Sequence, residues 1–286
     1  MKISIDIIRD RLSVRTYSGD PLSPGDIETI NRAILKAGPC PFATSPRFAL
    51  INVDRSKPGK LGRVGTYGVI KNAPAFIVGA MSPDPFAFVD YGYALEGIIL
   101  SATAAGLGTC WFGGIFDRKG VGKMLALAPD EVIPAISPVG RPAGRRTFAE
   151  RIIRGSAGST KRKPWNELFF DNVWDRPLPE TAAGAWSAIL EAVRLGPSAS
   201  NKQPWRLVRS GNAASPSFHL YLKEDAIYTR AIPGVLLQDL DAGIAMRHFE
   251  VAARHESLPG SWLRLDTDPV PGPAPLRYIA SWTSAG

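Results

Sequence analysis

The sequence predicts an α+β fold in which two related halves are joined in one chain of 286 residues. Three observations support this prediction. Stretches with an apolar residue at every third or fourth position, typical of helices, alternate with short apolar runs typical of strands. A loop flanked by two prolines occurs twice. A long apolar helix that begins with Asp and Gly also occurs twice, in the same order. Two matched pairs of this kind indicate an internal duplication of roughly 150 residues.

The two proline-flanked loops span residues 39–46 and 197–204, which are separated by 158 positions. Helices predicted at 27–36 and 185–193 end just before them, because each runs into a Gly-Pro pair. The second loop carries small polar side chains that suit the edge of a flat heteroaromatic ligand, although ordinary surface turns favour the same residues. These side chains are Ser198, Ser200 and Asn201.

The second repeat consists of two long apolar helices, predicted at 90–105 and 241–254. In each, the first Asp precedes a tryptophan by 21 residues, at Trp111 in one copy and Trp262 in the other. Glycine and alanine residues in both helices predict that the two pack closely against each other.

Each half retains a feature that the other has lost. The polar loop occurs only in the second half, since Cys40, Phe42 and Ala43 stand at the corresponding positions of the first. A glycine pair, Gly113 and Gly114, occurs only in the first half. Such complementary loss is expected when a symmetric dimer is fused and only one of its two composite sites is kept.

Apolar runs predict the strands at 48–53, 75–80, 134–140, 205–208, 218–222 and 276–282. Ser23 is the predicted N-cap of the first long helix. A small, polar and basic stretch at 155–164 is the best candidate for a linker. The halves are therefore expected at 1–154 and 180–286, with the linker at 155–179.

Near the start of the chain, Arg11, Ser13 and Arg15 alternate with apolar residues, so an extended segment would place all three on one side. Two guanidinium groups and a hydroxyl on one face suit a phosphate group, because arginine offers forked donors to its oxygens. A solvated basic edge of a strand would show the same pattern.

Composition excludes several classes of protein. The net charge of +8 is spread along the chain without a nucleic-acid-binding motif, so no nucleic-acid partner is expected. No apolar run is long enough to span a membrane, and the first residues do not resemble a signal peptide, which predicts a cytoplasmic protein. Two cysteines and three histidines argue against a disulfide framework and a zinc site. His248 and Cys110 are interpreted as packed core residues and not as catalytic groups.

Together, the Arg11-x-Ser13-x-Arg15 segment, the 197–205 loop, the helix end at 106–111 and the basic pair Arg145-Arg146 resemble the nitroreductase family of flavin oxidoreductases. The resemblance covers most of residues 9–150 and 180–262. The position of the polar loop in the second half makes the chain similar to fused, two-half members. The resemblance implies a three-layer α/β/α fold, internally duplicated, and a monomer that acts as a pseudo-dimer.

The resemblance also implies a role for each site residue, with FMN bound between the halves. The phosphate and ribityl chain would be held by Arg11, Ser13 and Arg15, with Arg145 or Arg146. The ring would be contacted by Pro197, Ser198, Ser200 and Asn201. The backbone amide of Gly113 or Gly114 would face flavin N5. Members of the family commonly lack a catalytic acid-base residue, and none is expected here.

The expected activity is that of an FMN-dependent NAD(P)H oxidoreductase. NADH or NADPH would deliver hydride to flavin N5, and the reduced flavin would pass it to a nitroaromatic, quinone or related small-molecule acceptor. A non-catalytic flavin-binding carrier or sensor is the alternative. A basic interaction protein with no cofactor is a third hypothesis, which a colourless, flavin-free preparation would favour.

Overall fold

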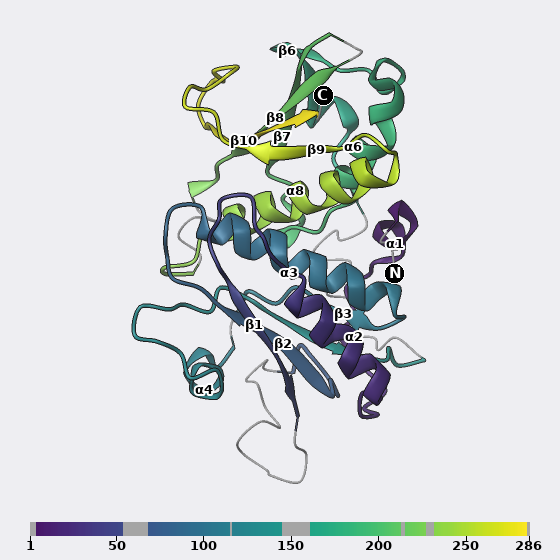
Figure 1. Ribbon diagram of the computed structural model, residues 1–286, viewed down its shortest axis with the longest axis vertical. Coiled ribbons are helices and arrows are strands. Elements are labelled where there is room, and N and C mark those ends of the chain that lie inside the picture. The colour runs from purple at the N-terminus through teal and green to yellow at the C-terminus, as the bar shows by residue number, and fades with distance from the viewer. Residues whose placement is uncertain are drawn as a thin grey trace.

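The computed structural model describes residues 4–53, 68–114, 116–144, 161–212, 215–226 and 232–284. In these parts of the chain, two β-sheets lie at opposite ends of the molecule, and two long helices pack against each other between them (Figure 1). The expected mixed α and β fold, with two halves in one chain, is confirmed.

The helices and 3₁₀ helices are α1 (Ile5–Asp10), α2 (Pro24–Leu35), α3 (Ala87–Ala104), α4 (Arg118–Met124), η1 (Trp165–Glu167), η2 (Glu180–Trp186), α6 (Ser187–Arg194), η3 (Ala199–Asn201) and α8 (Leu237–His255). The strands are β1 (Arg47–Asn52), β2 (Ala75–Ala80), β3 (Gly108–Thr109), β4 (Ile136–Gly140), β5 (Phe169–Asp171), β6 (Val173–Pro177), β7 (Trp205–Gly211), β8 (Pro216–Lys223), β9 (Gly260–Leu263) and β10 (Leu276–Ser284). Each helix and strand predicted above is present, with ends that differ by a few residues.

The first sheet has the antiparallel order β1-β2-β4-β3 and is covered on both faces. Successive residues of a strand point to opposite faces. Ala75 and Ile77 of β2 therefore pack into the cluster that contains α2 and α3, whereas Phe76 and Val78 pack into the cluster that contains α4. This half has the three layers expected of it.

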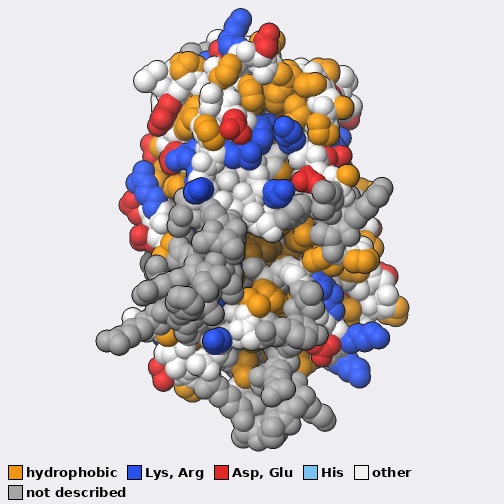
Figure 2. Space-filling view, turned by 180° about the vertical axis from the view of Figure 1, so that it is seen from behind, with side chains coloured by type: hydrophobic (Ala, Val, Ile, Leu, Met, Phe, Trp, Pro, Cys, Tyr) orange, Lys and Arg blue, Asp and Glu red, His pale blue; other side chains and the backbone are white. Residues whose placement is uncertain are grey.

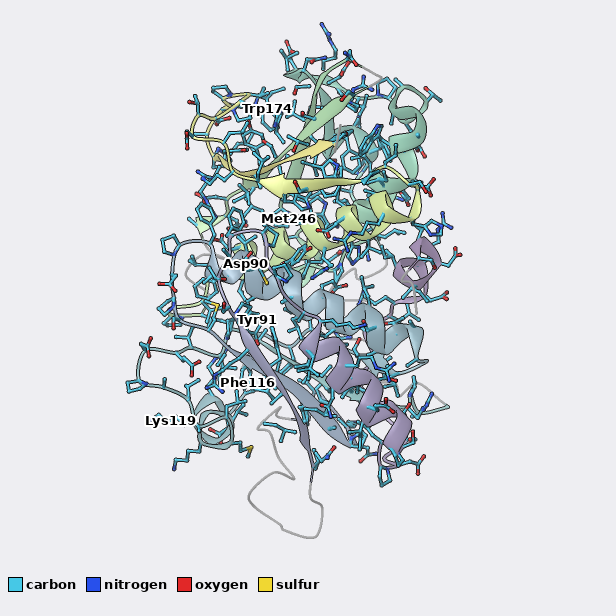
Figure 3. All side chains as sticks on the ribbon, in the orientation of Figure 1. Asp90, Tyr91, Phe116, Lys119, Trp174 and Met246 are labelled. Carbon is cyan, nitrogen blue, oxygen red and sulfur yellow. The ribbon has the colours of Figure 1, made fainter. Side chains whose placement is uncertain are left out.

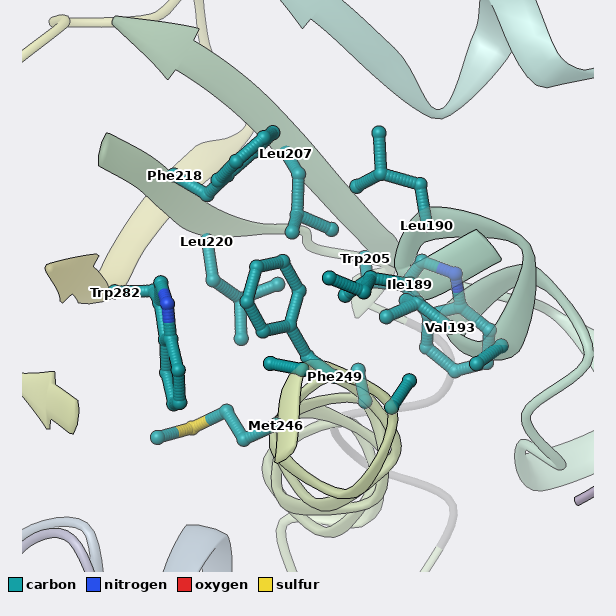
Figure 4. Packing of buried hydrophobic residues seen from close by; sticks show 14 of the residues in the cluster. Ile189, Leu190, Val193, Trp205, Leu207, Phe218, Leu220, Met246, Phe249 and Trp282 are labelled. Carbon is teal, nitrogen blue, oxygen red and sulfur yellow. The ribbon is translucent and has the colours of Figure 1, made fainter. Parts of the chain in front are cut away.

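The second sheet has the order β6-β5-β7-β8-β10-β9, in which β5 pairs with β7 in parallel and the remaining pairs are antiparallel. One face packs on α6 and α8, where Phe249 lies among Phe218, Leu220 and Trp282 (Figure 4). On the other face, Tyr221 and its neighbours contact side chains of β6 and of the connection before β10, so within the described residues no helix covers it.

The long helices cross at two glycines, Gly92 of α3 and Gly243 of α8. A Cβ atom added at Gly92 would lie 2.2 Å from the Leu240 carbonyl oxygen, and one added at Gly243 would lie 2.0 Å from the Val89 carbonyl oxygen. Only glycine allows two backbones to approach so closely. The predicted close packing of the two helices is confirmed.

The segment expected as a linker is partly built into the second half. Its described residues, 161–179, include η1, β5 and β6, and β5 pairs with β7 in the second sheet. From the first half, α1 contributes Ile5 and Ile8 to the hydrophobic cluster of the second half. The boundaries at 154 and 180 remain predictions.

Local predictions also hold. Ser23 Oγ accepts a hydrogen bond from the Asp26 amide at 3.2 Å, and the Ser23 amide donates to the Asp26 carboxylate, which completes a capping box. His248 and Cys110 are buried, as expected of core residues. On the face that Figure 2 shows, Lys and Arg side chains are interspersed with acidic and hydrophobic ones. No helix within the described ranges is long and apolar enough to cross a membrane.

Candidate functional site

A cavity of about 700 Å³ lies between the two halves. Its lining includes each predicted site residue that the structure describes: Arg11, Ser13, Arg15, Gly113, Gly114, Pro197, Ser198, Ser200 and Asn201. Arg145 and Arg146, the remaining predicted residues, lie outside the described residues. Segments almost 190 positions apart in the sequence therefore meet at one site.

The basic segment is extended, and its backbone is tied to the strand beside it. Ser13 bridges Thr109 in parallel, and the Val14 amide donates to the Thr109 carbonyl at 2.8 Å. The side chains of Arg11, Ser13 and Arg15 consequently reach the same cavity.

Arg11 is the clearest sign that this end of the cavity suits an anion. Its side chain is only 5% exposed, and the nearest carboxylate oxygen, Glu96 Oε1, lies 3.8 Å from its Nε. Among the described residues, neither Nε nor Nη1 of Arg11 has a hydrogen-bond partner. A buried guanidinium group with unused donors is costly unless an anion accepts from it.

Arg162 is a further basic group of the cavity, which the sequence prediction missed. Its Nη1 donates to Asn201 Oδ1 at 3.1 Å and its Nη2 donates to the Leu195 carbonyl at 3.0 Å. Burial, together with the nearby charges of Arg11 and Arg194, lowers the pKa of Arg162 to about 10. The run Lys161-Arg162-Lys163 was the available signal, but it was assigned to the linker.

The polar loop of the second half holds the segment that carries Arg162. Asn201 Nδ2 donates to the Lys161 carbonyl at 2.8 Å, and Gln203 Oε1 accepts from the Lys163 amide at 2.8 Å. Ser198 Oγ accepts from the Gln203 amide at 2.8 Å, which closes the loop on itself. Asn201 was expected only along the edge of a ring, yet its carboxamide also fixes the basic end of the cavity.

Each half uses a helix aspartate to hold its proline-flanked loop. Asp90 accepts from the amides of Phe42 and Thr44 at 3.1 and 3.0 Å and from the Thr44 hydroxyl at 2.8 Å. Asp241 Oδ1 accepts from the Ala199 amide at 2.9 Å, and its Oδ2 has no partner among the described residues. Burial raises the pKa of both carboxyl groups, and that of Asp241 rises well above its usual value. Only Asp241 lines the large cavity.

The glycine pair supplies two backbone amides at another wall of the cavity. Within the described residues, neither the Gly113 amide nor the Gly114 amide donates a hydrogen bond. A Cβ atom at Gly113 would lie 3.3 Å from Leu237 Cδ2, whereas one at Gly114 would meet nothing within 4 Å. A ligand can therefore approach these amides closely.

Apolar side chains form the rest of the wall: Trp111, Phe112, Ile232, Leu237, Leu240 and Ile244. The indole Nε1 of Trp111 donates to Glu96 Oε2 at 2.6 Å, which fixes its ring. The cavity thus combines a cationic end with apolar walls and two backbone amides that donate to no described residue. That set of groups suits a molecule with a phosphate at one end and a planar heteroaromatic ring at the other.

A second, smaller cavity of about 240 Å³ lies at the pseudo-symmetric position. It is lined by the first proline-flanked loop, including Pro39 and Pro41, and by Trp262 of the second half. Arg247 also lines it: its Nε donates to the Tyr93 carbonyl at 3.0 Å, and its guanidinium group stacks 3.5 Å from the Tyr93 ring centre.

Comparisons with known proteins identify a family and relatives for this chain. The model of the family described as "Putative TM nitroreductase" matches residues 4–253. A protein of Archaeoglobus fulgidus named "Putative NADH dehydrogenase/NAD(P)H nitroreductase" is 27% identical over 176 residues, which are 58% of this chain and 100% of the relative. A protein of the same name from Methanothermobacter thermautotrophicus is 29% identical over 149 residues, or 49% of this chain and 77% of the relative.

Among solved structures, a "putative nitroreductase" from Thermotoga maritima shares the fold. Its TM-score is 0.57 at 20% identity, and the superposition covers 99% of this chain and 93% of that protein. The family model covers well over half of the residues, and the cavity joins the segments that carry the resemblance. The chain therefore belongs to the nitroreductase family.

Proposed function

We propose that this protein is an FMN-dependent oxidoreductase that takes electrons from NADH or NADPH. The observation that carries this proposal is the buried Arg11 guanidinium group, whose Nε and Nη1 lack hydrogen-bond partners within the described residues. Arg15 and Arg162 line the same cavity, so three arginines are available to a phosphate group. The names of the two relatives support a nicotinamide reductant.

In this proposal, Arg11, Ser13, Arg15 and Arg162 hold the phosphate and the ribityl chain. Pro197, Ser198, Ser200 and Asn201 lie along one edge of the ring, and an amide of the glycine pair faces N5. Arg145 or Arg146 remains a candidate for the phosphate group. When bound, FMN accepts hydride at N5 and passes it to a second substrate, here a nitroaromatic, a quinone or a related acceptor.

The protein's own part is to bind, orient and exclude water. Ile232, Leu237 and Ile244 give the cavity an apolar wall against which a planar reductant or acceptor can stack. Amide donors fixed beside N5 stabilise negative charge that develops there, and they do so without reorganising during the reaction. No side chain is assigned the role of general acid or base.

We infer that one chain suffices for the site, because both halves of the composite cavity come from the same chain. A monomer is therefore expected in solution. Light scattering or sedimentation would test this, and an obligate dimer that shares FMN between chains would contradict it.

The absorption spectrum of the purified protein, with its ratio of FMN to chain, tests the proposal. We expect flavin bands and one FMN per chain after reconstitution. Anaerobic bleaching by NADH or NADPH, followed by reoxidation with a quinone or nitroaromatic compound, would distinguish an enzyme from a flavin carrier or sensor. A protein that takes up no FMN would overturn the proposal, and one that binds FMN without bleaching would favour the carrier or sensor.

A further inference from the structure

Arg118, the first residue of α4, directs its guanidinium group at the backbone of the glycine pair. Its Nη2 donates to the Gly113 carbonyl at 2.8 Å and its Nη1 donates to the Gly114 carbonyl at 3.0 Å. Its Nε donates to the Ile133 carbonyl at 3.2 Å, and Nη2 also reaches the Pro134 carbonyl at 3.3 Å. One side chain thus ties the glycine loop to the segment that precedes β4.

This guanidinium group has little freedom. Its central carbon lies 4.1 Å from the centre of the Phe116 ring, and the group is half-buried. Burial lowers the pKa of Arg118. The planar fork of an arginine is suited to holding several carbonyls at once, which the compact ammonium group of a lysine is not. We call this set of Arg118 contacts a clamp, because they hold the loop at Gly113 and Gly114 in place, which a mobile surface contact would not do.

The clamp fixes the direction of one amide. In a trans peptide the C=O and N–H bonds point in opposite directions, so the Gly114 N–H points away from the group that binds the Gly113 carbonyl. A cation bound to the carbonyl also polarises the peptide and makes its N–H a stronger donor. Within the described residues this N–H has no acceptor, although Gly114 lines the cavity.

We infer that Arg118 is a positioning residue that holds the Gly113–Gly114 peptide so that the Gly114 amide, and not the Gly113 amide, donates to flavin N5. This inference rests on the proposed function, since it concerns a residue that acts on bound FMN through the loop. Arg118 thereby stabilises electron density at N5 and makes the flavin easier to reduce.

The test compares Arg118→Met, Arg118→Lys and Lys119→Met in the full chain reconstituted with FMN. Lys119 is the next residue of α4, and its exposed side chain lies on the outer side of the helix (Figure 3). Its substitution removes one positive charge without touching the loop. The readouts are FMN affinity, the midpoint potential of the flavin and the affinity for sulfite, which adds directly to N5.

We expect both Arg118 variants to bind FMN about as tightly as the native protein, because the phosphate contacts lie elsewhere. Sulfite affinity should fall about tenfold or more, the loss expected for a charge-assisted hydrogen bond. The midpoint potential should become more negative. Arg118→Lys should resemble Arg118→Met, because a lysine cannot reach the loop carbonyls together. Lys119→Met should match the native protein.

Unchanged potential and sulfite affinity in FMN-loaded Arg118→Met would overturn this role while leaving the proposed function intact. If Lys119→Met changed the potential and the sulfite affinity as much as Arg118→Met does, this role would also be overturned. The loss of one positive charge would then explain both results. A native protein that takes up no FMN would overturn the proposed function and this role together. Arg118→Lys keeps the test informative if Arg118→Met does not fold.

Discussion

Glu96 Oε1 lies 2.8 Å from His248 Nε2, and both side chains are completely buried. Glu96 belongs to α3 and His248 to α8, so the contact joins the two halves. His248 Nδ1 lies 2.8 Å from the Ala192 carbonyl, which can only accept, and Nδ1 therefore carries a proton. The contact with Glu96 needs a second proton, shared between the imidazole and the carboxyl group. Glu96 also faces Arg11 and accepts from Trp111, which links this pair to the cavity.

The first prediction is that Glu96→Gln lowers the free energy of unfolding by about 1–3 kcal/mol, the cost of leaving buried polar groups poorly paired. A carboxamide lacks the charge that faces Arg11, so the buried guanidinium group loses its nearest carboxylate. Urea unfolding of the FMN-free protein measures the change. Glu28→Gln is the control, because Glu28 pairs with Arg32 on the exposed face of α2 and should contribute less than about 0.5 kcal/mol. Equal effects of the two substitutions would contradict a special role for the buried pair.

The second prediction concerns the cationic end of the cavity. Replacement of Arg11, Arg15 or Arg162 by Ala should weaken FMN binding by roughly 1.5–3 kcal/mol, the range for a charged hydrogen bond. Fluorescence titration at two salt concentrations measures this, and any solvent-exposed part of the effect should shrink at high salt. Arg9→Ala is a matched control, since Arg9 pairs with Asp6 on the surface. Unchanged affinity in an Arg11→Ala, Arg15→Ala double variant would refute the assignment.

The third prediction concerns Asp241, whose pKa in the folded protein is raised by burial. A raised pKa means that the folded state binds a proton more tightly than the unfolded state does. The contribution of Asp241 to stability is therefore full below its unfolded pKa of about 4 and is lost as the pH rises through the folded value. Asp241→Asn does not titrate, and its amide oxygen can still accept from Ala199. The variant should gain stability relative to the native protein as the pH rises above about 4.

Thermal unfolding of native, Asp241→Asn and Asp6→Asn proteins from pH 4 to 9 would measure this. Asp6 is exposed on α1, and its substitution should leave the pH profile unchanged. A difference between native protein and Asp241→Asn that stays constant across this range would show that folding does not raise the pKa of Asp241.

Sequence patterns could predict the elements whose signals are local. Helical periodicity located α3 and α8, and apolar runs located β2 and β4. The Ser23 cap could be predicted because its partner, Asp26, is only three residues away. The duplication then predicted which distant segments would meet. This prediction rested on the repeated loops and helices, so errors in the predicted ends of single helices or strands did not affect it.

Other features could not be predicted from the sequence, because they depend on contacts made only in the tertiary structure. β5 has only three residues and pairs in parallel with β7, so its segment was assigned to the linker. Arg162 stands in a basic run that would suit a solvated linker equally well. Arg118 binds backbone carbonyl groups, and the direction of a backbone carbonyl cannot be predicted from the pattern of side chains in the sequence. The unpaired oxygen of Asp241 likewise distinguishes it from Asp90 only once both loops are folded.

The fourth prediction concerns the crossing of the long helices. Gly243→Ala would place a methyl group 2.0 Å from the Val89 carbonyl oxygen, so the helices must move apart. We expect a loss of about 1–3 kcal/mol in the free energy of unfolding, as is usual for overpacking. Gly25→Ala is the control, because its nearest neighbour would be 4.0 Å away in the first turn of α2. If Gly243→Ala is as harmless as Gly25→Ala, the helices are not in contact at this point.

The last prediction is that each chain binds one FMN, in the larger cavity. The pseudo-symmetric cavity has about 240 Å³ against about 700 Å³, and Arg247 on its wall is bound to the Tyr93 carbonyl. The residues 158 positions after Arg11 and Ser13, which are Phe169 and Asp171, cannot bind a phosphate group at this second cavity. Phe169 is buried in the core, and Asp171 is paired with Arg209, whose guanidinium group lies 2.8 Å away.

The two loops nevertheless share one backbone feature, since Ala43 and Asn201 adopt φ angles of 57° and 56°. This similarity allows a matched pair of variants. Asn201→Gly tolerates the positive φ and removes only the carboxamide, so it should impair FMN retention and flavin reduction. Ala43→Asn introduces the carboxamide at a φ that asparagine accepts, yet it should restore no second site, because the smaller cavity lacks the space and its Arg247 and Arg254 are already engaged by Tyr93 and Glu250. Titration to two FMN per chain in either protein, or native FMN affinity in Asn201→Gly, would show that the functional site is not divided between the halves in this way.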